Sequence, residues 1–220
     1  MQKKKILMML ALLTTATAWA DDVNLNEDTG ETAGTAARWY VNMPKTGTNT
    51  LTLTDASVTT FKVYDNGGKS GKYSSNCNGY LVLTAPEGYV LQLSGNITTE
   101  NYWDKLTVYD GSTNSGTTLL NAVSSTGNGI ATAIQTVAST GQSMTLYFYS
   151  DSGNYYYAGL DLTVTLISTS AEYNITVSNP AMGGNVAASV GGTTVTTAKW
   201  NDAVTLTATP PTATCSATSA

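Results

Sequence analysis

Acidic side chains lie close together where a loop is predicted to enter a strand. The stretch 96–111, NITTENYWDKLTVYDG, contains Glu100, Asp104 and Asp110. Polar and apolar side chains alternate over 105–109, which predicts a half-buried strand that ends in an Asp-Gly turn. Glu100 and Asp104 therefore precede this strand, in a loop that a rigid scaffold would hold in place.

A second acidic loop follows another predicted strand. The sequence YSDSGN at 149–154 comes directly after the run MTLYFY at 144–149 and places Asp151 near a strand end. Hard cations such as Ca²⁺ take several oxygen ligands, which carboxylates from separate segments can supply. The two loops therefore predict a site for a hard cation. The alternative is that these acids are solvated turn residues, because Asp is common in turns.

Residues 1–20 have the pattern of a secretory signal peptide. Lys residues at 3–5 precede the apolar run ILMMLALL at 6–13, and Ala-Trp-Ala at 18–20 is a small-x-small cleavage pattern. The apolar run is far shorter than the roughly 20 residues that a membrane span needs. The residue directly after the cleavage position is Asp21 and not Cys, which argues against an N-terminal lipid anchor. We therefore expect a secreted or cell-surface chain without a membrane span.

Charge and residue types exclude several functions. Removal of residues 1–20 takes away three Lys and no acid, which leaves 7 basic and 15 acidic side chains and a net charge of −8. This balance disfavours nucleic acid and anionic membrane surfaces as partners. The chain has no His, so imidazole zinc sites and Ser-His-Asp triads are excluded. Cys77 and Cys215 are predicted to be unpaired thiols, with Cys77 buried, and a disulfide between them is the alternative.

The composition predicts an all-β protein. Only 11% of the residues are charged, and Thr, Ser, Gly and Asn dominate the polar remainder. Thr and Tyr favour strands, while Gly, Asn and Ser favour turns. Short alternating runs separated by turn residues predict an antiparallel β-sandwich over 39–168, with negligible helix after residue 20. The predicted strands include 80–85, 89–95, 105–109, 118–123, 131–137, 144–149 and 160–167, with Leu81, Leu83, Val90 or Leu91, Leu106, Val108, Leu146 and Phe148 in the core.

The segments that flank the predicted sandwich have a different composition. Residues 21–38 hold five acids against Arg38 alone and predict a disordered acidic leader. Residues 169–172 predict a linker, and alternation restarts over 173–211 as a small second β unit that would have a poor core alone. Residues 212–220 predict a flexible tail. Because the second unit looks incomplete, we expect the natural chain to continue with further domains.

Four ordered motifs within residues 51–168 resemble a CUB domain of the kind carried by secreted bacterial proteins. They are Pro-Glu-Gly-Tyr at 86–89, WDKLTVYDG at 103–111, Phe-Tyr-Ser-Asp at 148–151 and Gly-Leu at 159–160. The resemblance implies a jelly-roll β-sandwich that binds extracellular proteins or glycans through one loop end, often through a Lys of the partner. The segment from Tyr173 resembles part of a bacterial immunoglobulin-like or internalin-type B repeat.

Calcium-binding CUB domains use one Glu and two Asp as metal ligands. The resemblance implies that Asp104 and Asp151 are the two Asp ligands. The usual spacing of the family places the Glu ligand at Asn96, and Glu100 is the nearby acid that a shorter loop would deliver. The resemblance therefore predicts Ca²⁺ held by Glu100, Asp104 and Asp151.

Other residues of this resemblance support the site or depart from the family pattern. Tyr73 matches a Tyr that steadies the ligands, and backbone carbonyls near Ser112 and Ser152, with water, would complete the calcium shell. The family disulfides are mostly missing, because the partner of Cys77 is absent and Asn101 stands where another Cys is expected. A core of this size can be stable without them.

Aromatic side chains flank the predicted ligands in both loops. Exposed Tyr and Trp stack on sugars and supply contact hot spots, although alternate members of such a cluster can instead fill a core. The candidate ligand-binding residues, with Tyr73, are Tyr102, Trp103, Tyr155, Tyr156 and Tyr157.

These observations predict a non-catalytic module that recognises a protein or glycan in a calcium-dependent way. One alternative is a passive spacer in an adhesin stalk, and another is an accessory domain of a secreted hydrolase. The pair of Glu100 and Asp104 could imitate the acids of a glycosidase. We do not expect an enzyme, because the chain lacks a long insert to build a cleft and many folds carry acid pairs without chemistry.

Overall fold

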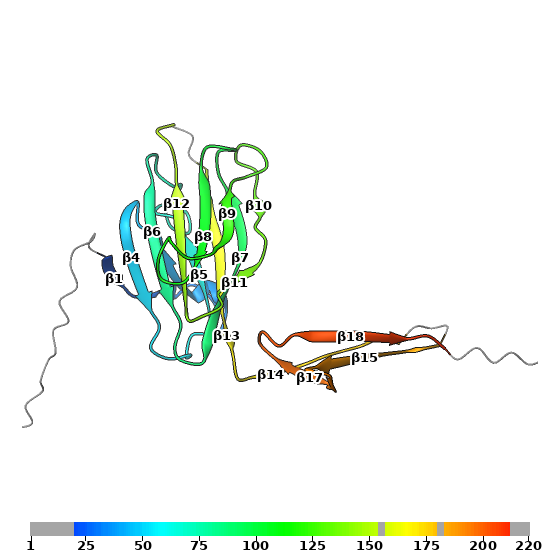
Figure 1. Ribbon diagram of the computed structural model, residues 1–220. Coiled ribbons are helices and arrows are strands. Elements are labelled where there is room, and N and C mark those ends of the chain that lie inside the picture. Colours follow the sequence, from blue (N-terminus) through cyan, green and yellow to red (C-terminus); the bar gives the residue numbers. More distant parts are fainter. Residues whose placement is uncertain (1–19, 154–156, 180–182, 212–220) are drawn as a thin grey trace, which may run out of the picture.

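The computed structural model describes residues 20–153, 157–179 and 183–211 of the chain (Figure 1). Two sheets form a β-sandwich, which confirms the predicted all-β fold class. The first sheet has the order β1 (Ala20–Val23), β4 (Thr46–Thr52), β6 (Asn78–Thr84), β12 (Ser143–Tyr149), β8 (Lys105–Asp110) and β9 (Thr118–Val123). The second has the order β10 (Thr132–Ala133), β7 (Tyr89–Thr98), β13 (Gly159–Ser168), β5 (Thr60–Tyr64), β3 (Trp39–Asn42) and β2 (Asn26–Glu27), and β11 (Val137–Ala138) also pairs with β7.

The core lies between the two sheets, where the alternation in the sequence places it. In β12, for example, Met144, Leu146 and Phe148 are each at most 1% exposed, while Tyr147 and Tyr149 point to the other face. All residues predicted for the core are buried, including both Val90 and Leu91. Burial of this continuous apolar layer is the main favourable contribution to folding of the sandwich.

Three strand pairs are parallel, which the local sequence pattern does not show. β1 pairs with β4, β4 with β6, and β3 with β5 in parallel register, whereas the remaining pairs in the sandwich are antiparallel. The chain leaves the first sheet after β4, forms β5 in the second sheet and returns as β6. These two crossings bring the chain back in its original direction, so β4 and β6 run parallel.

Residues 21–38 form ordered structure in place of the predicted disordered leader. β1 and β2 lie in this segment, and a 3-10 turn (η1, Ala36–Arg38) follows them. Three of the five acids have basic partners: Lys69 Nζ contacts Asp28 at 2.8 Å and also Glu31, and Arg38 contacts Glu27. Lys69 is distant in the sequence, so the count of charges within the segment misses this neutralisation.

The chain leaves the sandwich at the end of β13. Thr169 donates its backbone N–H to the carbonyl of Gly88 at 2.9 Å, so the predicted linker begins against the sandwich. The second unit then contains a two-stranded and a three-stranded sheet. Their strands are β14 (Glu172–Asn174) with β17 (Thr197–Lys199), and β16 (Thr193–Thr194), β15 (Asn185–Val190) and β18 (Val204–Thr209).

The second unit buries little apolar surface within the described residues. Ala188 is its one fully buried hydrophobic side chain there, and every residue of β18 is exposed. The sandwich therefore holds the main core and positions the candidate site. No helix in the described part of the chain has the length and apolar character to span a membrane.

Buried Asp65 joins two strands of the second sheet and makes stability depend on pH. Asp65 directly follows β5 in the chain. Its carboxylate accepts the backbone N–H of Leu160 in β13 at 2.8 Å and that of Gly67 at 2.7 Å. Burial raises the pKa of Asp65 to about 6, although both hydrogen bonds act to lower it. A raised pKa in the folded state means that the folded chain binds this proton more tightly than the unfolded chain.

We therefore predict that this carboxyl lowers the free energy of unfolding as pH rises from about 4 to 7, by about 3 kcal/mol at most. Urea unfolding at several pH values measures this effect. Asp65→Asn should be less stable throughout, because its amide nitrogen cannot accept one of the hydrogen bonds, but it should lose this share of the pH slope. An unchanged slope in Asp65→Asn would contradict the assignment.

Candidate metal centre

Strand register brings two of the predicted ligands together. β12 and β8 are antiparallel, and Tyr149 at the end of β12 pairs with Lys105 at the start of β8. Asp104 immediately precedes β8, and Asp151 follows β12 by one residue. The two carboxylates therefore meet at one end of the sandwich although 47 positions separate them in the sequence.

The third acid joins them from the loop between β7 and β8. One carboxylate oxygen each from Glu100, Asp104 and Asp151 lies within 4.8 Å of the others. Asp104 is 2% exposed and Glu100 9% exposed, while Asp151 is partly exposed at the rim. The cluster is thus anchored in the protein on one side and open to solvent on the other.

Tyr73 holds two parts of this cluster in position. Its hydroxyl donates to Asp104 Oδ2 at 2.5 Å and accepts the backbone N–H of Glu100 at 3.1 Å. Its ring packs edge-on against Phe148, with ring centroids 5.3 Å apart. Tyr73 is only 1% exposed, so it positions the acids from the interior of the sandwich. It cannot contact a partner at the surface, contrary to its prediction as a ligand-binding residue.

The Asp104 carboxylate has one hydrogen bond on each oxygen. Oδ2 accepts the Tyr73 hydroxyl, and Oδ1 accepts the backbone N–H of Asp151 at 3.0 Å. A carboxylate oxygen has a second lone pair, so both oxygens remain able to bind a cation. These bonds fix the direction of the carboxylate before any ion binds.

A serine- and threonine-rich segment between β9 and β10 holds the loop that carries Glu100. Thr99 and Tyr102 donate their backbone N–H groups to the hydroxyls of Ser125 at 2.7 Å and Ser124 at 3.2 Å. Asn101 donates its N–H to Asn128 Oδ1 at 2.8 Å. These supporting residues were not predicted from the sequence, because short polar residues in a loop have no periodicity that indicates their partner.

The loop that carries Asp151 is tied to the segment containing Cys77. Ser150 donates its hydroxyl to the carbonyl of Ser74 at 2.8 Å and accepts the Cys77 N–H at 2.9 Å. The Asp151 carbonyl accepts the N–H of Asn76 at 2.7 Å. Cys77 is a buried free cysteine, and burial raises the pKa of its thiol, whereas Cys215 lies outside the described residues. These contacts assign Cys77 a structural role.

Two residues considered for the site lie elsewhere. Asn96 is exposed on β7, where it pairs with Asp161 and Ala133, so Glu100 is the acid that joins the cluster. Ser112 lies beyond the opposite end of β8 from Asp104 and cannot supply a backbone carbonyl to the same ion. The shorter loop reaches the cluster through Glu100 because Tyr73 and the segment 124–128 hold it there.

Burial and mutual repulsion disfavour the charged forms of the acids. Burial is the main cause that raises the pKa of Glu100, followed by repulsion from Asp104 and Asp151. Burial also raises the pKa of Asp104, against the opposing effects of the Tyr73 hydroxyl and the Asp151 N–H. A bound cation would relieve the repulsion and replace lost hydration. This acidic cluster could therefore hold a metal ion, and its all-oxygen donor set suits a hard one.

The aromatic candidates divide into exposed and packed residues. Tyr102 is 75% exposed and Trp103 is 61% exposed, directly before Asp104 in the chain. Tyr102 adopts a φ of 68°, which is uncommon for a bulky residue and is maintained by the loop contacts described above. Tyr157 instead packs against the core, and Tyr155 and Tyr156 lie outside the described residues.

Comparisons with known proteins place few limits on the function. No family model matches the chain, and no curated protein matches it. A solved structure of the full extracellular region of zebrafish Gpr126/Adgrg6 matches with 16% sequence identity and a TM-score of 0.37. The match covers 66% of this chain and 22% of that one, so the chain spans about a fifth of the receptor region. A likeness this weak carries no functional argument, so any functional conclusion depends on the geometry of the site.

We predict that Tyr73→Phe lowers the free energy of unfolding by about 1–3 kcal/mol, because it removes the hydrogen-bond partner of Asp104 Oδ2 and of the Glu100 N–H while keeping the ring. Urea denaturation measures the change. Tyr147→Phe is the control, since that hydroxyl lies on the outer face of the sheet, and it should change stability little. Equal losses in the two variants would contradict the positioning role of Tyr73.

Proposed function

We propose that the protein is a secreted or cell-surface recognition module that is not an enzyme and that binds a protein or glycan in a calcium-dependent way. The observation that supports this proposal is the convergence of Glu100, Asp104 and Asp151 at one end of the sandwich. The signal-peptide pattern of residues 1–20 supports an extracytoplasmic location.

Calcium is the cation that best fits the donor set. Ca²⁺ accepts six to eight oxygen ligands in irregular arrangements, whereas Mg²⁺ demands a nearly ideal octahedron. Three carboxylates from two loops supply a flexible part of such a shell, and water can fill the open side. Bound calcium would neutralise the acids and hold the loops that carry Glu100 and Asp151 against each other.

The surface next to the ion provides contacts for a partner. Tyr102 and Trp103 present large aromatic side chains to solvent. Their backbone is held by the hydrogen bond from the Tyr102 N–H to Ser124 and by the start of β8 two residues after Trp103. Rigid aromatic residues bind at a low entropic cost and are frequent hot spots. We propose that these side chains contact the partner while the ion fixes the loop that carries them.

We predict that calcium raises the melting temperature and that chelator lowers it. At a hundredfold excess over the dissociation constant, the gain in unfolding free energy is about 2.7 kcal/mol. Asp104→Asn should remove most of this gain, because it removes a central charged ligand while keeping the side-chain size. Glu100→Gln should also reduce it, since Glu100 rather than Asn96 lies in the cluster.

Asp110→Asn is the matched control for this experiment. Asp110 ends the same strand, and its carboxylate accepts the N–H and hydroxyl of Thr140, away from the cluster. Its calcium-induced shift in melting temperature should equal that of the wild type. Identical curves with calcium and with chelator for the wild type would exclude the calcium proposal.

A second prediction concerns the partner. An array of extracellular proteins and glycans, probed with the whole chain, should include at least one signal that disappears both in chelator and in the variant Trp103→Ala. Trp103→Ala should keep the calcium-induced rise in melting temperature, because it removes a contact residue and leaves the ligands intact. Calcium-induced stabilisation without any chelator-sensitive array signal would favour the alternative of a spacer stabilised by calcium.

A further inference from the structure

The outer face of the first sheet is an uncharged surface at its centre. None of the residues in the neighbouring strands β4, β6 and β12 carries a charge, although the chain has 25 charged side chains. Thr48, Thr50 and Thr145 pair in register with Tyr80 and Val82 of β6, so hydroxyl-bearing side chains surround the centre of this face.

A pair of stacked tyrosines stands on this surface. Tyr80 on β6 and Tyr147 on β12 are directly opposite in register, with ring centroids 4.4 Å apart and an interplanar angle of 18°. The stack fixes the orientation of Tyr80, so little side-chain entropy remains to be lost on binding. Both side chains are partly exposed.

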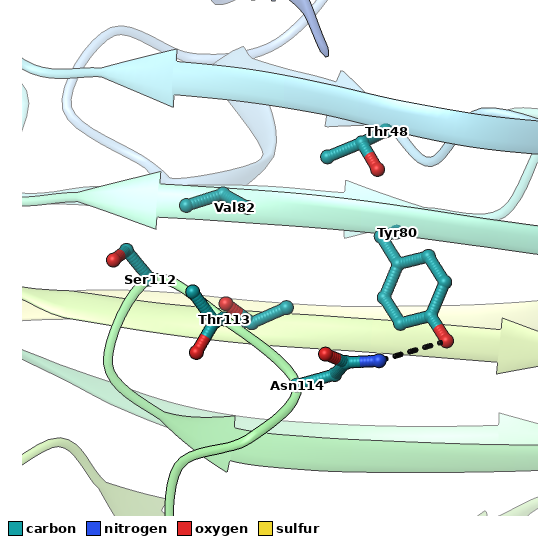
Figure 2. Close-up of a pocket in the computed structure, with 7 residues that line it drawn as sticks. Thr48, Tyr80, Val82, Ser112, Thr113 and Asn114 are labelled. Atoms are coloured by element: carbon teal, nitrogen blue, oxygen red, sulfur yellow. Dashed lines mark hydrogen bonds between the residues drawn. The ribbon is translucent and has the colours of Figure 1, made fainter. Parts of the chain in front are cut away.

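A loop folds over the same face and borders an open cavity beside Tyr80. The loop after β8 is held by the Thr145 hydroxyl, which donates to the Gly111 carbonyl at 2.8 Å, and by the Asn114 amide, which lies 3.5 Å from the Tyr80 hydroxyl (Figure 2). The cavity has a volume of about 260 Å³. Its lining consists of Thr48, Tyr80, Val82, Ser112, Thr113, Asn114 and Thr145.

We propose that this cavity binds one sugar unit of a neutral glycan. Tyr80 offers an aromatic ring whose orientation the stack with Tyr147 fixes, and Tyr80 is the member of the stack that lines the cavity. The hydroxyls of Thr48 and Thr113 and the amide of Asn114 can donate to and accept from sugar hydroxyls. An aromatic surface with a few convergent polar groups is the composition expected of a small ligand site.

Other ligand classes fit this cavity less well. The lining contains no basic side chain, which disfavours phosphate and acidic sugars. The apolar side chain in it, Val82, is only 9% exposed, so a protein partner finds no pocket for an apolar anchor. The volume is slightly below the roughly 300 Å³ at which drug-sized pockets begin, which fits a single sugar ring.

This site is distinct from the metal centre. Its lining includes no metal-ligand candidate, and the loop containing Ser112 and Asn114 follows the end of β8 that is remote from Asp104. The inference therefore goes beyond the calcium-dependent function, and glycan binding at this cavity does not require calcium.

Affinity electrophoresis of the whole chain tests the proposal with four soluble neutral polysaccharides: xylan, mannan, β-1,3-glucan and hydroxyethyl cellulose. At least one should retard the wild type equally in calcium and in chelator. Tyr80→Ala should weaken this binding at least tenfold, since it removes the ring. Tyr80→Phe should stay within threefold, because the ring remains and the contact with Asn114 is at the limit of a hydrogen bond.

The double variant Thr113→Ala with Asn114→Ala keeps the test decisive if Tyr80→Ala fails to fold. Both residues are exposed in the loop, and the variant should fold normally and bind at least threefold more weakly. Retardation by none of the four polysaccharides, loss of binding in chelator, or full binding by the double variant would each overturn the proposal.

Discussion

The antiparallel register of β8 and β12 is the constraint on which the candidate metal centre depends. It places Asp104 before one strand end and Asp151 after the adjacent one, and the core residues of both strands fix that register. A shift of one strand by one position would turn its own core residues, such as Leu106 of β8 or Leu146 of β12, out of the core. The apolar core therefore enforces the proximity of two carboxylates that repel each other, and a cation is the natural means to offset that repulsion.

Hydrogen bonds around the cluster offset the cost of its negative charge only in part. Tyr73 and the Asp151 N–H both favour the charged form of Asp104, yet burial still raises its pKa. The arrangement fixes the carboxylates in advance and leaves their remaining lone pairs available. Such preorganisation favours ion binding, since few side chains lose freedom when the ion arrives. Trp103 directly precedes Asp104 in the chain and is exposed, so an ion at this site would also fix the loop that presents Trp103 to solvent.

The sequence predicts the strands of the sandwich well because one face of each strand is buried. The alternation in 80–85, 105–109 and 144–149 identifies β6, β8 and β12, and the inward residues are those found in the core. The parallel pairing of β4 with β6 could not be predicted in this way, because it depends on a crossing through the other sheet. The ordered segment 21–38 was also missed, since two of its acids, Asp28 and Glu31, contact Lys69 from a distant turn.

The candidate site was predictable in its acids and not in its supports. Asp and Glu near strand ends are visible in the sequence, whereas the hydroxyls of Ser124 and Ser125 that hold the Glu100 loop resemble any polar turn. The stacked tyrosines of the outer face were likewise hidden, because Tyr80 and Tyr147 belong to strands 67 positions apart whose register only the fold defines.

A crystal structure of the chain grown with calcium tests the central claim most directly. We expect one ion with six to eight oxygen ligands at roughly 2.3–2.6 Å, among them carboxylate oxygens of Glu100, Asp104 and Asp151. Anomalous scattering identifies the ion independently of the ligand distances. Well-ordered acids hydrated by water alone in saturating calcium, or an ion bound elsewhere in the sandwich, would contradict it.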